Sequence, residues 1–218
     1  MGFLGAGKTT VLNGLLAQKP AHETWAVLMN EAGKIEVNEG FTASVKQSEN
    51  TNVGKIAIKQ VIGGCMCCTS YLPMQIGLSR LLSHARPNRL FIAVTGTGHP
   101  TQLIQQLSSA YWSEALSLQA VLTVINPHLL HDRRLLDHAI FQAQISHADL
   151  LVVSHADDMQ PQDDAALQHL LQQDCYKQQP VLQVDHGNLL LAQINVPHQV
   201  KPKRQQISYI KIDDATKV

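Results

Sequence analysis

The stretch Gly2-Phe-Leu-Gly-Ala-Gly-Lys-Thr9 decides the fold, because it satisfies the pattern G-x-x-x-x-G-K-[ST] of a phosphate-binding loop, or P-loop. Successive backbone N–H groups of such a loop wrap phosphates, and glycine tolerates the backbone angles that this requires. Lys8 would reach the β and γ phosphates, and Thr9 would hold Mg²⁺. The alternative is a glycine-rich turn without a ligand, which the string G-A-G-K-T-T before a leucine-rich helix disfavours.

Apolar runs alternate with helix-like stretches along the rest of the chain, a pattern typical of parallel βαβ units. Several runs are continuously apolar, as expected of strands covered on both faces. We therefore predict an α/β fold of the P-loop NTPase type, with a mostly parallel sheet and helices on both faces. Predicted strands cover Thr24–Met29, Ile56–Ile62, Leu90–Thr95, Ala120–Ile125, Leu150–Ser154 and Pro180–Val184; predicted helices cover Lys8–Gln18, Tyr71–His84, Thr101–Ser109, Leu136–Ser146 and Asp163–Gln173.

The two ends of the chain carry further expectations. A P-loop normally follows a buried strand, yet this motif begins at residue 2, so we expect the first strand to be missing. Either the true start lies upstream, which we favour, or a central strand has been lost, which would leave a buried edge unpaired. We predict one nucleotide-binding domain over residues 1–198 and a polar, basic tail over 199–218, with a possible strand at Ile207–Ile212.

Composition narrows the class of protein. The 218 residues contain 17 Lys plus Arg and 17 Asp plus Glu, so the basic excess usual in nucleic-acid binders is absent. No apolar run reaches the roughly 18 residues of a membrane span, and no basic region followed by an apolar stretch marks a signal peptide. We expect a cytoplasmic protein whose four cysteines are reduced and available for metal or redox chemistry.

Three of the cysteines lie within four residues, at Cys65, Cys67 and Cys68. Cys65 and Cys68 have the C-x-x-C spacing of zinc sites, and thiolates prefer Zn²⁺ or Cu(I) to Mg²⁺. The local sequence supplies no fourth ligand. Small buried cysteines and a redox C-x-x-C pair remain alternatives, and the lone Cys175 is expected to fill space.

These motifs together resemble the CobW/HypB/UreG family of P-loop GTPases, and within it the CobW-like metallochaperones. G-F-L-G-A-G-K-T-T at residues 2–10 is similar to the family's P-loop, and G-C-M-C-C at 64–68 is similar to its metal motif. The other similar segments are Asn30-Glu31-Ala32-Gly33, Thr95-Gly96 through Pro100, His147-Ala148-Asp149, Ser154-His155-Ala156-Asp157 and His186-Gly187. The resemblance covers nearly all of residues 2–190.

The resemblance implies GTP binding, GTP hydrolysis and delivery of a divalent metal, often zinc, to client proteins. It implies that Asp157 reads guanine, that Thr9 holds Mg²⁺, and that Cys65, Cys67 and Cys68 carry Zn²⁺. The tail 199–218 would then be the remnant of a linker to a C-terminal domain. The nucleotide-binding positions that it implies are Gly2, Gly5, Ala6, Gly7, Lys8, Thr9, Thr10, Ser154, Asp157 and His186.

Several positions depart from the family pattern. Ala93 stands where the family has a glutamate that helps hold Mg²⁺, so Lys8 and Thr9 would act without it and hydrolysis should be slow. His155 replaces the lysine of the guanine motif, and Asp157 has the alternative role of capping the next helix. The other departures are Met29, Lys34 and His99. They leave a second hypothesis open: a degenerate relative that binds nucleotide or zinc without turnover.

Four further residues are expected to serve structure. His128 and His131 lie three residues apart, and we predict a solvated or capping role because no third ligand is near in sequence. Trp25 and Trp112 are predicted to pack in the interior.

Overall fold

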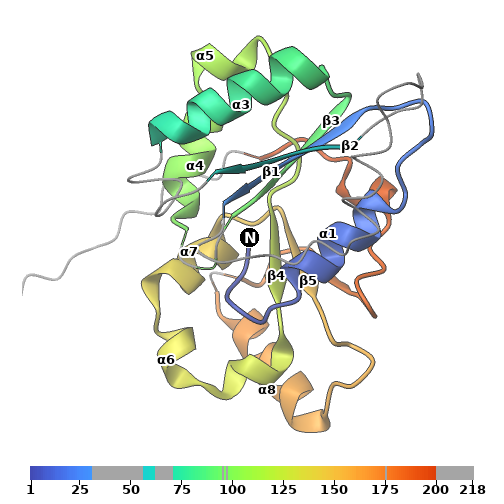
Figure 1. The fold of residues 1–218 in the computed structure, drawn as a ribbon. Helices are drawn as coiled ribbons and strands as arrows, with labels where there is room; N and C mark the ends of the chain where they lie inside the picture. Colours follow the sequence, from blue (N-terminus) through green and yellow to red (C-terminus); the bar gives the residue numbers. More distant parts are fainter. Residues whose placement is uncertain (31–55, 62–70, 95, 97, 175, 200–218) are drawn as a thin grey trace, which may run out of the picture.

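The computed structural model describes residues 1–30, 56–61, 71–94, 96, 98–174 and 176–199 of the 218-residue chain. Strands and helices alternate along these residues, and helices cover the strands from more than one side (Figure 1). In chain order the elements are α1 (Lys8–Leu16), β1 (Trp25–Asn30), β2 (Ile56–Val61), α3 (Tyr71–Ala85), β3 (Arg89–Ala93), α4 (Pro100–Leu107), α5 (Ala110–Ser113), β4 (Leu122–Ile125), the 3-10 helix η1 (Pro127–His131), α6 (Arg133–Leu136), α7 (Ala139–Ser146), β5 (Leu150–Val153), α8 (Pro161–Gln172), β6 (Val181–Gln183) and the 3-10 helix η2 (Leu191–Ile194).

The strands form two parallel sheets of three strands each, in the orders β2-β1-β3 and β4-β5-β6. The predicted α/β class is therefore confirmed, and each of the six strands predicted between residues 24 and 184 overlaps an observed one. The possible strand at Ile207–Ile212 lies outside the described residues. The single sheet of the prediction is divided between β3 and β4 within the described residues. Sequence patterns locate strands by their own apolar runs, whereas sheet membership depends on distant hydrogen-bonding partners.

The central strand of each sheet is the most buried. Trp25, Ala26 and Leu28 of β1 are fully buried, and so are Leu151 and Val152 of β5. A strand covered on both faces has no water-facing side, which explains why these segments are continuously apolar. Trp112 is also buried, so both tryptophans are packing residues as predicted.

One predicted helix is corrected. The segment Leu136–Ser146 was expected to form a single helix, but α6 ends at Leu136 and α7 begins at Ala139. The side chain of His138 accepts a hydrogen bond from the Ile140 N–H at 3.2 Å and so begins α7 locally. The intervening residues break the helix although the apolar spacing continues through them.

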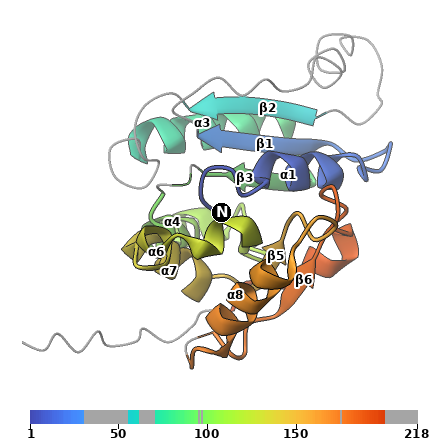
Figure 2. The ribbon, with the colours of Figure 1, turned by 90° about the horizontal axis from the view of Figure 1, so that it is seen from below.

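The amino terminus lies between the two sheets (Figure 2). The Met1 amino group donates to the Leu122 carbonyl, and the Val124 N–H donates to the Met1 carbonyl at 2.9 Å. This is the bonding pattern of a parallel ladder, so Met1 extends alongside β4 immediately before the P-loop. None of the helices in the described part of the chain has the length and apolar character of a membrane span.

Candidate functional site

The P-loop leads from Met1 into α1 through glycines that no other residue could replace without strain. Gly5 and Gly7 have φ angles of 76° and 79°, in the left-handed region that side chains disfavour. At Gly2 a Cβ atom would lie 2.3 Å from the Val124 carbonyl oxygen, so a side chain cannot fit there. The glycines of the motif are thus needed for the backbone path as well as for its close approach to β4.

The amino end of α1 is suited to an anion. Gly7 is the N-cap and supplies no side-chain acceptor, and the first turn holds no acidic residue. The first N–H groups of such a helix carry a partial positive charge that favours phosphate. The Lys8 ammonium donates to the Phe3 carbonyl at 2.8 Å, which places it over the loop. Thr9 and Thr10 follow on the first turn, where Thr9 is half-buried and Thr10 is exposed.

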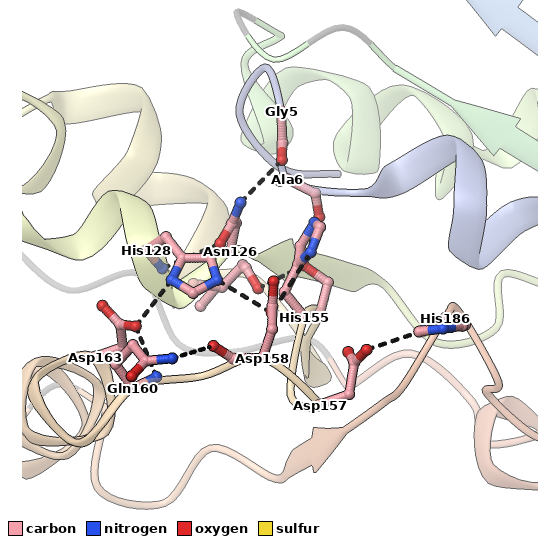
Figure 3. A network of polar contacts seen from close by, with 12 residues as sticks. Gly5, Ala6, Asn126, His128, His155, Asp157, Asp158, Gln160, Asp163 and His186 are labelled. Carbon is pink, nitrogen blue, oxygen red and sulfur yellow. Dashed lines mark hydrogen bonds and ion pairs between the residues drawn. The ribbon is translucent and has the colours of Figure 1, made fainter.

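Two side chains from the second sheet hold the loop in place. The Ser154 hydroxyl, just after β5, lies 3.0 Å from the Ala6 carbonyl oxygen and 3.2 Å from the Ile125 carbonyl oxygen. Asn126, just after β4, donates from Nδ2 to the Gly5 carbonyl at 3.3 Å (Figure 3). Ser154 was predicted to lie at the site, whereas Asn126 was not. The sequence feature that could have indicated Asn126 is its place as a polar residue between an apolar strand and Pro127.

The segments that follow β5 and β6 meet beside α1. Asp157 Oδ2 lies 3.2 Å from His186 Nδ1 (Figure 3). Gly187 packs so closely on α1 that a Cβ atom there would lie 2.6 Å from the Thr10 carbonyl oxygen. Three of the predicted site segments therefore converge: the P-loop helix, the segment around Asp157 and the turn at His186.

The alternative role of Asp157 as a helix cap is wrong. The next helix, α8, begins at Pro161 with Gln160 as its N-cap. The Gln160 N–H donates to Asp163 Oδ2 at 2.9 Å, so Asp163 serves the start of this helix. Asp157 is engaged with His186 instead, and its carboxylate lies at the surface of the converged segments.

A network of histidines and aspartates links η1 to the start of α8. His128 Nδ1 lies 2.8 Å from Asp163 Oδ2, His128 Nε2 lies 3.1 Å from Asp158 Oδ1, and His131 Nε2 lies 2.6 Å from Asp163 Oδ1. The hydrogen bond with Asp158 raises the pKa of His128. Hydrogen bonds from the Gln160 N–H and from His131 lower the pKa of Asp163. Within the described ranges, no group of three or more His, Cys, Asp or Glu side chains is arranged to hold a metal ion.

This network gives a prediction for pH. A raised His128 pKa stabilises the fold below the ordinary value of 6.5 and loses that effect as the pH rises through the shifted pKa. A lowered Asp163 pKa stabilises the fold above its ordinary value of 3.8 and loses that effect in acid. We expect the difference in melting temperature between the protein and His128→Asn to be largest between these two values and to shrink above them. The exposed His22, changed to Asn, is the control, and a His128 difference that is as flat as the control would contradict the prediction.

The loop after β3 is held by a residue that sequence analysis missed. Gln144 of α7 is fully buried, and its Nε2 donates to the carbonyls of Gly96 at 3.0 Å and Gly98 at 3.3 Å. Gly96 approaches the P-loop, since a Cβ atom there would lie 2.9 Å from the Leu4 nitrogen. The sequence feature that could have indicated Gln144 is a polar residue within an otherwise apolar helix face.

The sequence profile described as "CobW/HypB/UreG, nucleotide-binding domain" matches residues 1–183. The chain belongs to this family. The resemblance inferred from the P-loop and cysteine motifs is thereby confirmed.

Two curated relatives of this CobW/HypB/UreG domain bear the name zinc chaperone. YeiR of Escherichia coli K12 is 37% identical over 188 residues, which cover 86% of this chain and 54% of the relative. CobW of Pseudomonas aeruginosa is 26% identical over 186 residues, covering 72% of this chain and 48% of the relative. The chain thus spans about half the length of these relatives.

Solved structures of the family share the fold. The Zn(II)-bound YjiA GTPase of E. coli superposes with a TM-score of 0.59 at 20% identity, over 93% of this chain and 64% of that structure. HypB of Helicobacter pylori in complex with nickel gives a TM-score of 0.53 at 15% identity, over 85% of this chain and 76% of that structure. At these identities the likeness establishes the fold and no more.

Several family motifs fall partly or wholly outside the described residues. These are the three-cysteine motif at 65–68, the segment at 31–34, and Thr95, Thr97 and Cys175. Of the departures from the family pattern, Ala93 ends β3 and contributes no carboxylate there. His99 is exposed just before α4, and His155 is exposed with a φ angle of 55°.

Proposed function

We propose that this chain binds GTP and hydrolyses it slowly, and that this cycle is coupled to binding a divalent metal, zinc, and delivering it to a client protein. The observation that carries the proposal is the convergence of the P-loop, Asp157 and His186 around α1. The curated relatives named zinc chaperones support the metal part. The zinc would be cargo, carried by Cys65, Cys67 and Cys68.

The P-loop and the first turn of α1 would bind the phosphates. Backbone N–H groups of the loop from Gly2 to Thr10 would donate to the phosphate oxygens, with Gly5, Ala6 and Gly7 forming its centre. Lys8 would move from the Phe3 carbonyl to the β and γ phosphates, which costs little because that carbonyl is a neutral acceptor. Ser154 would keep the loop in position through the Ala6 carbonyl.

The described residues could hold Mg²⁺ only if the ion kept most of its water ligands. Thr9 offers one hydroxyl oxygen on α1, while β3 ends in Ala93. Mg²⁺ keeps several of its waters in nucleotide sites and is held there by few protein ligands. When bound, the ion would neutralise phosphate charge. Without an acidic residue at 93 the attacking water would be less well ordered, which is the reason for proposing slow hydrolysis.

Asp157 would select guanine, and this gives a prediction. Its carboxylate would accept hydrogen bonds from the guanine N–H groups, contacts to a charged group worth about 1.5–3 kcal/mol. Asp157→Ala should therefore lower GTP affinity roughly 10- to 150-fold and leave ATP affinity unchanged. Asp158→Ala is the matched control, because this neighbouring carboxylate contacts His128. Equal effects of the two variants on GTP would contradict guanine reading by Asp157.

His186 would lie at the edge of the base site. Its ring contacts Asp157, so guanine must displace that contact or share the carboxylate with it. The variant His186→Ala, which removes the ring, tests whether guanine displaces the His186 contact or shares the carboxylate with it. Tighter GTP binding indicates displacement, and weaker binding indicates that His186 contributes to the nucleotide site.

The decisive experiment separates binding from turnover. Calorimetric titration of the reduced protein with a non-hydrolysable GTP analogue and Mg²⁺, repeated with the ATP analogue, should show micromolar, GTP-selective binding. Phosphate release then distinguishes the two hypotheses: slow turnover supports the GTPase. Intact affinity without turnover supports the non-hydrolysing relative, which the alanine at 93 favours. If neither nucleotide binds, both hypotheses, the GTPase and the nucleotide-binding relative without turnover, are refuted.

Zinc binding is tested independently of nucleotide. Cys67→Ala should weaken Zn²⁺ affinity and spare GTP affinity, since one of three clustered thiolates is removed. Cys175→Ala is the control from the same chain. Unchanged zinc affinity in Cys67→Ala would count against the cysteine motif as the metal site.

A further inference from the structure

A stripe of side chains along α7 contacts both loops of the phosphate side of the site. The stripe consists of His138, Phe141, Gln144 and His147, which follow one another at intervals of three residues from the N-cap of α7 to its C-cap. Successive members lie side by side on a helix at this spacing. The first two pack edge to face against Phe3 of the P-loop, with ring centroids 5.2 and 5.8 Å apart. The other two contact the loop after β3.

Gln144 is an unfavourable residue for packing alone. Its side chain is fully buried, and its Nε2 donates to the carbonyls of Gly96 and Gly98. Since both neighbours are acceptors, the amide nitrogen must face them. The amide oxygen is left buried, and no described residue donates a hydrogen bond to it. An unpaired buried oxygen lowers stability, and an apolar side chain would avoid that loss. What Gln144 contributes is therefore its hold on the two carbonyls.

His147 holds the same segment farther along the chain. Its Nδ1 lies 2.8 Å from the Ala143 carbonyl oxygen, and its Nε2 lies 3.1 Å from the Thr101 hydroxyl. A carbonyl oxygen can only accept, so Nδ1 carries the proton, and in the neutral ring Nε2 accepts from the Thr101 hydroxyl. Helix α7 is thus hydrogen-bonded to the chain both before and after His99.

The helix that carries Gln144 is itself fixed to the second sheet. The Thr123 hydroxyl of β4 donates to the Gln144 carbonyl at 2.7 Å, and both residues are fully buried. The next residue of β4 is Val124, whose carbonyl lies against Gly2. Strand β4 therefore fixes α7 and the start of the P-loop relative to each other.

The loop after β3 lies at the end of the P-loop where a terminal phosphate would be. A Cβ atom on Gly96 would lie 3.1 Å from the Phe3 carbonyl carbon. The Phe3 carbonyl is also the group that accepts from the Lys8 ammonium. Because Lys8 is expected to reach the β and γ phosphates, Gly96 would lie beside the γ phosphate and far from the base.

We propose that Gln144 is a positioning residue that sets the preference of this site for GTP over GDP. By holding the carbonyls of Gly96 and Gly98, it would keep the loop after β3 against Phe3, where the backbone of the loop meets the γ phosphate. GDP lacks that phosphate, so its affinity should not depend on Gln144. The inference rests on the proposed function, and Gln144 would act through the loop without touching the nucleotide.

The experiment compares two glutamines of the same helix. Gln144→Met keeps an unbranched side chain of similar length and removes both hydrogen bonds. Calorimetric titration with Mg²⁺ and either the non-hydrolysable GTP analogue or GDP should show analogue affinity lowered roughly 5- to 30-fold and GDP affinity changed by less than about twofold. Gln142→Met is the matched control, because Gln142 is exposed and donates to the Leu136 carbonyl, outside both loops.

Gln144→Glu separates the hydrogen-bond donor from the packing. A carboxylate has the shape of the amide and no donor, whereas the protonated carboxyl regains one O–H. Burial beside two carbonyl oxygens raises a carboxyl pKa, so lowering the pH from about 9 to about 6 should restore analogue affinity relative to GDP affinity. Each value is compared with the unchanged protein at the same pH. Gln144→Met should show no such recovery.

The outcomes separate this inference from the proposed function. If the unchanged protein binds both nucleotides and Gln144→Met loses affinity for both equally, or for neither, only the inference is overturned. Gln144→Glu affinities equal to those of Gln144→Met at every pH would also overturn it, as would a Gln144→Met chain that fails to fold, since the role would then be structural. If the unchanged protein binds neither nucleotide, the proposed function fails and the inference fails with it.

Discussion

Replacing Lys8 with alanine is expected to weaken GTP binding by roughly 30-fold to several thousand-fold. The ammonium lies over the P-loop, 2.8 Å from the Phe3 carbonyl, where it would meet the phosphates. Removing one partner of a hydrogen-bonded charge pair in a protected site costs about 2–5 kcal/mol, and each 1.4 kcal/mol is about tenfold in affinity. Calorimetric titration with the non-hydrolysable GTP analogue measures the loss.

The fold itself should tolerate this change. A single hydrogen bond to a neutral carbonyl contributes about 1 kcal/mol, so the melting temperature of Lys8→Ala should change by only a few degrees. Lys177→Ala is the control, because this lysine forms an exposed ion pair with Asp174, a contact of small energetic value. GTP affinity that is retained in Lys8→Ala would exclude the P-loop as the phosphate site.

Replacing Gly187 with alanine is expected to destabilise the protein by about 2–5 kcal/mol. The φ angle of 77° costs a side chain about 1–2 kcal/mol. In addition, the new Cβ atom would lie 2.6 Å from the Thr10 carbonyl oxygen and 2.7 Å from its carbon. Both are backbone atoms of α1, so relief requires α1 or the 186–188 turn to move, at about 1–3 kcal/mol. Thermal unfolding should show a fall of roughly 4–20 °C in melting temperature.

Gly5→Ala separates the two causes. Gly5 has nearly the same φ angle, 76°, but among the described residues a Cβ atom there would meet only the Leu129 side chain, at 4.0 Å. This variant should lose about 1–2 kcal/mol, the conformational part alone. Equal losses of stability in Gly187→Ala and Gly5→Ala would show that the turn at 187 does not press on α1. They would also weaken the argument that this turn and the P-loop helix are packed together.

Much of the fold follows from local sequence. Leu150–Ser154 was predicted as a strand and β5 covers Leu150–Val153, because a continuously apolar segment that is buried on both faces has few other options. The P-loop was recognised for a similar reason, since its glycines are needed by the backbone path itself. Helix α4 begins at Pro100, one residue before the prediction, and proline is common at the first position of a helix.

The features that could not be predicted from the sequence depend on contacts between residues that lie far apart in the chain. Asn126 and Gln144 hold the P-loop and the loop after β3 through carbonyl groups 121 and 48 residues away. A polar residue after a strand or inside a helix is common, and only the folded chain shows what it contacts. The division into two sheets is likewise invisible in the apolar pattern, because that pattern reports burial of each strand and not the neighbour to which it bonds.

The anchoring of the P-loop also sets when it can form during synthesis. Gly5 and Ala6 of its motif are held by Asn126 and Ser154, which are synthesised 121 and 148 residues later. At about 5–20 residues per second, the nascent chain would spend roughly 8–30 s with the motif translated and its supports not yet made. Over that interval the glycine-rich segment is an unconstrained chain, so nucleotide would bind only after most of the domain had emerged.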